Sequence, residues 1–404
     1  MRRIFLNGLA ASAGSGITYL HNVVPHLSAS PGIHTTLVVQ PNLRENFEGL
    51  PRVQVLSPPR VLSTVRRLWF ERNQVPRLIQ KSSSDVLISA GNFALRKSPV
   101  PQILLSGNSL YTSADFYHDL RSRRSYHLLI DNFVKGVLAR KSVQWADRTI
   151  APTQAFAHDL RLWTGKKITV VRHGFDPKIF FRDDVSLSPH IEKELNRTER
   201  CLRLLFVSHY NYYRNFETLF RALPLIQNAL PATRVQLFLT CTLDPGKNPG
   251  TYDPRAAKKL VNELGITENI VGLGAVPYEA LHHLYRACDI YVTPAYAETF
   301  AHPLIEAMAS DLPIVASDIP AHREVCGPVA AYFDRFDFQD LAGKVVSTGS
   351  FSVETRSTLI VAGRQRAAEF SWSGHVQELL QIAAELCEGP NFAGAQARTL
   401  RQTA

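Results

Sequence analysis

Short apolar runs alternate with longer amphipathic stretches along this chain of 404 residues. In the first half, the runs that predict buried strands cover residues 3–7, 35–39, 53–56, 85–89, 102–106, 148–152 and 167–171. In the second half they cover residues 202–207, 235–239, 270–274, 289–294 and 312–317. Strands that alternate with helical patterns indicate parallel α/β sheets built from successive βαβ units.

Helical periodicity is expected over residues 17–27, 126–148, 340–346, 354–370 and 373–387. Residues 183–200 are polar, contain Pro189 and show no apolar periodicity, which indicates a linker. The sequence therefore predicts a Rossmann-like first domain over residues 1–182 and a second over 201–371. The helix over 372–387 is a candidate to pack back on the first domain, and the tail over 388–404 is expected to fray.

The composition is that of a globular protein, with 45% hydrophobic and 20% charged residues. No apolar run approaches the roughly 20 residues that cross a bilayer. Asn7 and Gly8 interrupt the first apolar run, which favours a strand and a glycine loop over a signal peptide. Five cysteines are scattered without metal-ligand spacing, which suits packing roles in a reducing cytoplasm.

Positive charge is concentrated in the first half. Residues 1–182 contain 25 Lys and Arg against 10 Asp and Glu, whereas the remainder has a balance of −5. Such a half can meet nucleic acid, anionic lipid or an acidic substrate. No nucleic-acid motif is present, so an anionic membrane surface or a phosphorylated lipid-linked acceptor is favoured. A solvated basic surface without a partner is the alternative.

The segment from Pro294 to Pro313 carries two glutamates, Glu298 and Glu306, eight residues apart at a loop-to-helix transition. A loop glutamate can accept hydrogen bonds from ligand hydroxyls. The backbone N–H groups of the first helical turn point at any anion placed there. Hydroxyl acceptors beside a phosphate-binding helix start are what a nucleotide-sugar site needs. The alternative is a surface loop followed by an amphipathic helix.

This segment resembles the E-x7-E signature of the retaining nucleotide-sugar glycosyltransferases of family 4, which have the GT-B fold. The likeness continues through residues 306–309, 313–318 and 324–325. It implies two Rossmann-like doubly wound domains facing a cleft, with the sugar donor bound by the second. Glu298 then corresponds to the carboxylate that contacts donor-sugar hydroxyls, and Glu306 to the one that binds the ribose. The resemblance adds to the donor site the backbone around Thr299, Phe300, Ala301 and Leu304.

A second donor loop follows the strand over 202–207. Family members usually carry an Arg and then a Lys-Asn pair there, both neutralising the diphosphate. Arg214 and Asn215 align with the pair, and a guanidinium serves a phosphate well. His209 stands where the Arg is expected; it is mostly neutral at pH 7, so this contact is weaker. An aromatic surface loop is the alternative. The resemblance also places the nucleotide base near Val276.

The first domain is less strongly specified. Gly14 and Gly16 open its first helix, where small residues let a ligand approach the backbone amides. The residues by themselves are equally compatible with a plain tight turn. Many family members have a His after the strand over 102–106, but this chain has Asn108, a candidate contact to the donor sugar. The nearest histidine, His118, is expected to belong to a helix. Gly174 is expected to form a structural turn between the domains.

The leading hypothesis is a retaining hexosyltransferase-type enzyme that extends a lipid-linked or polysaccharide acceptor, of the lipopolysaccharide or exopolysaccharide kind. No Asp-x-Asp motif ends a strand, so no metal and no cofactor beyond the nucleotide-sugar donor is expected. The expected location is the cytoplasm, with peripheral binding at the inner membrane face. Two alternatives stay open: a transferase with a soluble acceptor, and a non-catalytic nucleotide-sugar-binding protein.

Overall fold

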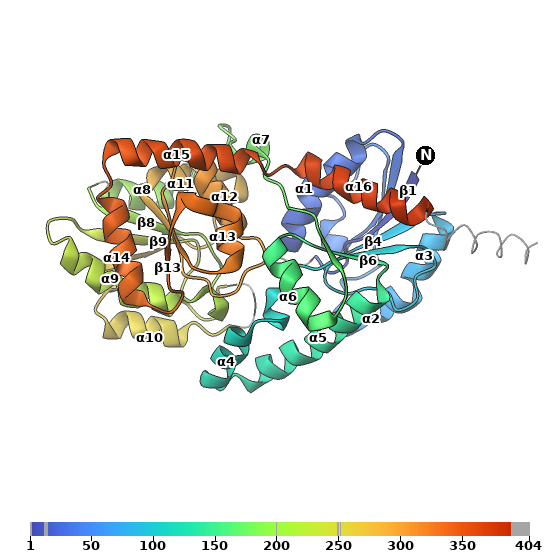
Figure 1. The fold of residues 1–404 in the computed structure, drawn as a ribbon, viewed down its shortest axis with the longest axis horizontal. Helices are drawn as coiled ribbons and strands as arrows, with labels where there is room; N and C mark the ends of the chain where they lie inside the picture. Colours follow the sequence, from blue (N-terminus) through green and yellow to red (C-terminus); the bar gives the residue numbers. More distant parts are fainter. Residues whose placement is uncertain (1, 12–14, 199, 249, 251, 389–404) are drawn as a thin grey trace, which may run out of the picture. The chain divides into compact units, whose positions relative to one another are not determined.

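The computed structural model describes residues 2–11, 15–198, 200–248, 250 and 252–388 (Figure 1). The chain divides into two compact units. The first takes the described residues within 1–112, 127–174 and 371–404, and the second takes those within 113–126 and 175–370. Each unit has its own parallel sheet and its own hydrophobic core.

Within the described residues, the first unit forms a seven-stranded parallel sheet in the order β3-β2-β1-β4-β5-β6-β7. Its strands are β1 (Arg2–Asn7), β2 (Ile33–Val38), β3 (Val53–Leu56), β4 (Val86–Ala90), β5 (Gln102–Leu105), β6 (Arg148–Ala151) and β7 (Ile168–Val170). Its helices are α1 (Ser15–Ala29), α2 (Thr64–Asn73), α3 (Val75–Lys81), α5 (Tyr126–Trp145), α6 (Gln154–Thr164) and α16 (Trp372–Glu388).

The described part of the second unit forms a six-stranded parallel sheet in the order β10-β9-β8-β11-β12-β13. Its strands are β8 (Leu202–Phe206), β9 (Val235–Leu239), β10 (Ile270–Gly272), β11 (Ile290–Thr293), β12 (Ile314–Ser317) and β13 (Ala330–Phe333). Its helices are α4 (Ala114–Ser122), α7 (Pro177–Phe180), α8 (Pro189–Arg197), α9 (Phe216–Ala229), α10 (Arg255–Glu263), α11 (Leu281–Ala287), α12 (His302–Ala309), α13 (Pro320–Cys326), α14 (Phe338–Gly349) and α15 (Val353–Ala368).

The prediction of two doubly wound Rossmann-like domains is confirmed by these two sheets. The strands are short apolar runs because helices bury both faces of a parallel sheet, as in β9, where every residue is buried. The order of the strands reverses once in each sheet, between β1 and β4 and between β8 and β11. Ligands of open α/β sheets bind at the carboxyl ends of the strands flanking such a reversal.

Two boundaries differ from the sequence prediction. Residues 183–200 are not a plain linker, because α8 forms there and buries Ile191 and Leu195, four residues apart, in the core of the second unit. Residues 113–126 lie within the predicted first domain but belong to the second unit, where Phe116 is buried. Both segments are mostly polar, so the sequence contains no clear signal for the few apolar residues that anchor them.

The C-terminal helix α16 belongs to the first unit, where it packs against α1. Trp372, Val376 and Leu379 of α16 share the core cluster of this unit with Tyr19 and Leu20 of α1. Gly174 lies against the start of the same helix. A Cβ atom on Gly174 would be 2.0 Å from the backbone N of Trp372, so only glycine fits this close approach.

We predict that Gly174→Ala destabilises the first unit by about 1–3 kcal/mol or more, because backbone atoms cannot give way as a flexible side chain can. Thermal unfolding should show a fall of several degrees. Gly107→Ala is the matched control, since a Cβ atom there meets nothing within 4 Å. Equal melting temperatures for the two variants would contradict the close packing of Gly174.

Candidate functional site

The candidate site lies at the carboxyl ends of β8 and β11, where the strand order of the second sheet reverses. Leu204 of β8 pairs with Ile290 of β11 in parallel, so the loops that follow both strands leave the same edge. The first loop leads to Arg214 and the second to Glu298. The sheet topology therefore brings together two sequence segments that each carried a predicted donor contact.

Arg214 and Glu298 form an ion pair. Their side chains are only 20% and 10% exposed, and the guanidinium also lies over the ring of Tyr213, 5.2 Å from its centroid. Within the described residues, the buried Nε of Arg214 donates to no acceptor. The pair thus presents a hydrogen-bond acceptor and a donor with unused capacity side by side, a combination that suits sugar hydroxyls and a phosphate.

Asn215 holds the two loops together. Its backbone adopts the left-handed conformation that asparagine tolerates, with φ of 55°, and it precedes the first residue of α9. Its side-chain amide donates to the carbonyls of Pro294 (3.1 Å) and Arg335 (2.6 Å). Its carbonyl accepts from Thr218 at 2.9 Å. Both ends of the side-chain amide are engaged, so Asn215 positions the two loops, and its contact to the diphosphate stays a prediction.

Glu306 is buried in α12 and accepts a hydrogen bond from the hydroxyl of Tyr285 at 2.8 Å. Burial raises the pKa of Glu306 to about 7, and the hydrogen bond from Tyr285 acts in the opposite direction. The hydroxyl of Tyr285 is itself fully buried, so it fixes the orientation of the carboxyl group. Sequence reasoning missed Tyr285, which lies in a helix 21 residues upstream.

The lead-in to α12 is strained at Ala301, which has φ of 61° although it carries a Cβ atom. Such a conformation costs about 1–3 kcal/mol and persists where the surroundings enforce it. Thr299 is partly exposed, whereas the side chain of Phe300 is buried in the core. Leu304 is fully buried, and its N–H donates to the carbonyl of Ala301 at 3.1 Å. The contact of Leu304 with the donor stays a prediction.

His209 and Val276 flank the site less closely. His209 is exposed on one side, and the partial desolvation of its ring together with the charge of Arg214 lowers its pKa below the usual value. The imidazole is therefore neutral at pH 7 and is a hydrogen-bonding group there rather than a cation. Val276 lies between β10 and α11 and packs partly buried against the core of the second unit.

His322 of α13 was not singled out by the sequence. It is fully buried, and its Nδ1 lies 3.0 Å from the carbonyl oxygen of Ser317, whose hydroxyl in turn donates to the carbonyl of Ala295. Burial lowers the pKa of His322 to about 4, and the charge of Arg214 adds to this shift. A neutral His322 thus links the end of β12 to the loop of Glu298.

The helix α4 also supports both loops. Asp119 of α4 accepts hydrogen bonds from Tyr296 (2.7 Å) and Arg123 (2.7 Å). Arg123 also donates a hydrogen bond to Glu217 of α9 at 2.8 Å. Tyr296 is two residues before Glu298, and its N–H donates to the carbonyl of Tyr213, next to Arg214, at 3.1 Å. No sequence signal connected α4 with these loops, because the contacts span about 100 to 180 positions.

The remaining predicted residues lie elsewhere. Asn108 belongs to the first unit, where its side chain accepts from the N–H of Leu110 at 3.0 Å and caps a short helical turn. Gly16 packs close to Ala11, since an added Cβ atom would lie 3.2 Å from the Cα of Ala11. Gly14 lies outside the described residues. His118 is exposed on α4, as expected of a helix residue.

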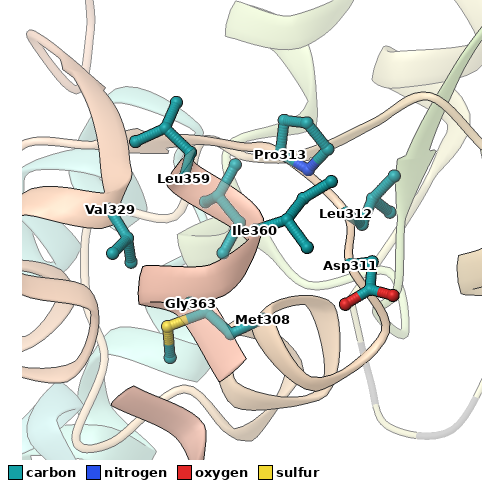
Figure 2. A pocket seen from close by; sticks show the side chains of 9 residues that line it. Met308, Asp311, Leu312, Pro313, Val329, Leu359, Ile360 and Gly363 are labelled. Atoms are coloured by element: carbon teal, nitrogen blue, oxygen red, sulfur yellow. The ribbon is translucent and has the colours of Figure 1, made fainter. Parts of the chain in front are cut away.

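A small apolar pocket of the second unit does not belong to the site. Figure 2 shows it between Met308 of α12, Leu312 and the residues Leu359 and Ile360 of α15. None of the predicted site residues lines it. It lies in the contact that holds α12 against α15.

Comparison with known families covers most of the chain. The family described as "Glycosyltransferase Family 4" matches residues 17–179, and "Glycosyl transferases group 1" matches residues 188–365. The chain therefore belongs to the family 4-type glycosyltransferases. Within its described residues, no helix is both long and apolar enough to cross a membrane.

Curated relatives of this glycosyltransferase include D-inositol 3-phosphate glycosyltransferases. The one from Stackebrandtia nassauensis is 25% identical over 68% of this chain and 65% of its own length. The one from Geodermatophilus obscurus is 28% identical over 64% and 56%, respectively. The chain thus matches between about half and two thirds of the length of these relatives.

Solved structures show the same fold over nearly the whole chain. Sucrose-phosphate synthase from Thermosynechococcus elongatus has a TM-score of 0.73 at 19% identity and covers 96% of this chain and 99% of its own. WaaG, a glycosyltransferase involved in lipopolysaccharide biosynthesis, has a TM-score of 0.66 at 15% identity and covers 96% and 100%. The GT-B fold is therefore confirmed.

We predict that Glu306→Gln gains stability relative to the wild type when the pH is raised from 5 to 8. The folded chain holds the Glu306 proton more tightly than the unfolded chain, whose carboxyl has a pKa of 4.5. This contribution to stability is full below about pH 4.5 and is lost as the pH rises through about 7. The melting temperature of the variant minus that of the wild type should rise by a few degrees from pH 5 to pH 8.

The exposed Glu354→Gln serves as control and should show no such trend. A pH-independent difference for Glu306→Gln would mean that the carboxyl group is not buried in a neutral form.

We predict that Asp119→Asn and Tyr296→Phe are coupled. Their hydrogen bond joins a carboxylate to a largely buried hydroxyl, so a double-mutant cycle in urea unfolding should give a coupling free energy of about 1 kcal/mol. Asp131→Asn with Tyr296→Phe is the control cycle, because Asp131 pairs with Lys135 on another helix. Additive effects of Asp119→Asn and Tyr296→Phe would rule out the α4 tether.

Proposed function

We propose that this chain transfers a sugar, with retention of anomeric configuration, from a nucleoside diphosphate sugar to a lipid-linked or polysaccharide acceptor. The observation that carries the proposal is the ion pair of Arg214 with Glu298 at the strand-order reversal of the second sheet, with Glu306 buried in the helix that follows the Glu298 loop. It combines a cation for a diphosphate with two carboxyl groups for sugar and ribose hydroxyls. Family membership supports the assignment.

On the donor side, Glu306 is proposed to accept hydrogen bonds from the ribose hydroxyls. Its carboxyl group is already oriented by Tyr285 and buried, so hydrogen bonds to it form in a region of low dielectric constant, where they are strong. Glu298 is proposed to accept from hydroxyls of the donor sugar. Val276 lies in the segment proposed to hold the base through backbone groups.

The diphosphate is proposed to lie against Arg214 and the lead-in to α12 around Thr299, Phe300 and Ala301. Arg214 is held by its ion pair, so little reorganisation is needed when negative charge grows on the departing diphosphate. Neutral His209 would add one hydrogen bond without adding charge. This proposed stabilisation uses side-chain and backbone groups of the protein alone, in line with the proposed metal-independent reaction.

In the proposed reaction, the bond between the anomeric carbon and the diphosphate breaks, and a bond to the acceptor hydroxyl forms on the same face. The hydroxyl proton passes to an oxygen of the leaving phosphate. No protein base is required for this step, which agrees with the engagement of Glu298 in an ion pair. Arg214 stabilises the charge left on the diphosphate.

The acceptor side is proposed for the first unit, with Gly16 and its helix start. Asn108 of the same unit stays a proposed contact to the donor sugar. The proposed acceptor is presented at the inner face of a cytoplasmic membrane. The excess of basic residues in the first 182 positions supports a phosphorylated lipid-linked acceptor or an anionic surface.

A soluble acceptor is the second candidate. The curated relatives are named D-inositol 3-phosphate glycosyltransferases, and the basic first half would also suit a phosphorylated soluble acceptor. Radiolabelled sugar transferred to water-soluble product, rather than to product extractable with organic solvent, would favour this candidate. Tight binding of a nucleotide sugar without transfer or hydrolysis would instead support a binding protein.

A thermal-shift screen with UDP, GDP, dTDP and ADP should identify the base by a single stabilising nucleotide. We then predict that Glu306→Ala and Glu306→Gln weaken binding of that nucleotide at pH 8 by about tenfold or more, because hydrogen bonds from the ribose hydroxyls to the ionised carboxylate are lost. Arg214→Ala should lower kcat by about 10²–10³-fold while changing nucleotide affinity far less.

Glu354→Ala and Arg221→Ala are matched controls on the exposed surface of the same unit. If the Glu306 and Arg214 variants keep wild-type binding and turnover, the assignment of the site is wrong. If no nucleotide sugar is turned over by the wild type, the enzymatic proposal itself is wrong.

A further inference from the structure

Four large apolar side chains of the helix α5 lie on the outside of the first unit. Ile130, Phe133, Val134 and Val137 are 60%, 59%, 60% and 42% exposed, respectively. Their spacing of three, four and seven residues places them on one face of the helix. They form a continuous apolar stripe, which is called the α5 stripe below.

The opposite, buried face of α5 is made mostly of small or polar residues, namely Asn132, Gly136, Ala139 and Ser142, with Val143 packed in the core. Asn132 is satisfied by the carbonyl of Leu110 at 3.0 Å, and Ser142 by the carbonyl of Leu138 in its own helix. A helix that only covers a sheet shows the reverse pattern, with large apolar residues inside and polar residues outside. The α5 stripe is therefore not explained by the packing of the first unit and marks an interaction surface.

Basic residues continue the same face. Arg140 and Lys141 follow Val137 by three and four residues and are both exposed. In the described part of the chain, neither forms an ion pair with an acidic side chain, whereas Lys135 on the flank is paired with Asp131 at 2.7 Å. An apolar stripe with unpaired cations beside it suits an anionic bilayer, which takes the apolar side chains into its headgroup boundary and attracts the charges.

We propose that the α5 stripe, with Arg140 and Lys141, binds the surface of an anionic lipid bilayer. The helix lies parallel to the bilayer and inserts the stripe, while the long basic side chains reach the lipid phosphates. A second helix of the first unit has the same character. In α2, Val65 and Trp69 are 77% and 60% exposed and lie among exposed arginines. Tryptophan suits the boundary between headgroups and acyl chains.

A second copy of the chain fits this surface less well. The cores of protein interfaces are depleted of charged residues, whereas the α5 stripe ends in two adjacent cations. Two copies that meet here would also bring together halves that each carry an excess of basic residues. The bilayer supplies both the apolar and the anionic component.

This inference extends the proposed function, because a lipid-linked acceptor is presented at such a surface. It does not depend on catalysis. Vesicle binding is measured without nucleotide sugar or acceptor, so a failure to bind lipid and a failure to transfer sugar are separate results.

The test is co-sedimentation of the full chain with phosphatidylcholine vesicles, with and without phosphatidylglycerol, at low and high salt. We expect binding only with phosphatidylglycerol, weakened by salt. The double variant Ile130→Ser with Phe133→Ser should bind about tenfold or more weakly at both salt concentrations. The double variant Arg140→Gln with Lys141→Gln should bind about fivefold more weakly for each charge removed, at low salt only.

Matched controls remove equally exposed residues elsewhere. Leu162→Ser with Val353→Ser changes two side chains that are 75% and 87% exposed, and Lys166→Gln with Lys167→Gln removes two exposed charges. Circular dichroism and thermal unfolding verify that all variants fold. The proposal is overturned if the wild type does not bind, or if the α5 variants bind no worse than the controls. It is also overturned if sedimentation shows a lipid-free dimer that the α5 variants dissociate.

Discussion

The parallel pairing of β8 with β11 is the constraint on which the candidate site depends. Backbone hydrogen bonds align the two strands, so their carboxyl ends reach the same edge of the sheet and their loops must leave together. Arg214 and Glu298 meet only for this reason. Asn215, His322 and the backbone bond from Tyr296 to Tyr213 then hold the loops in one arrangement, in which the strained Ala301 is retained.

The charged groups of the site are costly to bury, and each is compensated in a different way. Arg214 and Glu298 neutralise one another, although removing either partner would leave an uncompensated charge. Within the described residues Glu306 forms no ion pair; burial keeps the pKa of its carboxyl group raised, and Tyr285 orients it. A binding site for hydroxyls and a diphosphate is a physical reason to keep such groups where a packed apolar core would be more stable.

The two units differ in how they meet their surroundings. The second unit turns its polar groups toward one edge of its sheet and ties that edge down with α4, a helix drawn from the first half of the chain. The first unit leaves large apolar residues of α5 on its surface beside Arg140 and Lys141, which form no ion pair within the described residues. We propose the first surface for a small anionic donor and the second for an extended anionic partner.

The apolar runs predicted most strands and the E-x7-E resemblance predicted the GT-B fold, because buried parallel strands and a shared loop-to-helix motif are local properties of sequence. Local reading failed at α8 and α4, where one or two buried side chains such as Ile191 and Phe116 outweigh a polar composition. It also missed Tyr285, Tyr296 and His322, since their partners are distant along the chain or defined only by burial. The residue types needed for a donor site were thus determined by the sequence itself. Which of them are buried or fully hydrogen-bonded, as the Leu304 side chain and the Asn215 amide are, was decided only by tertiary structure, because burial and hydrogen-bond saturation arise from contacts between remote segments.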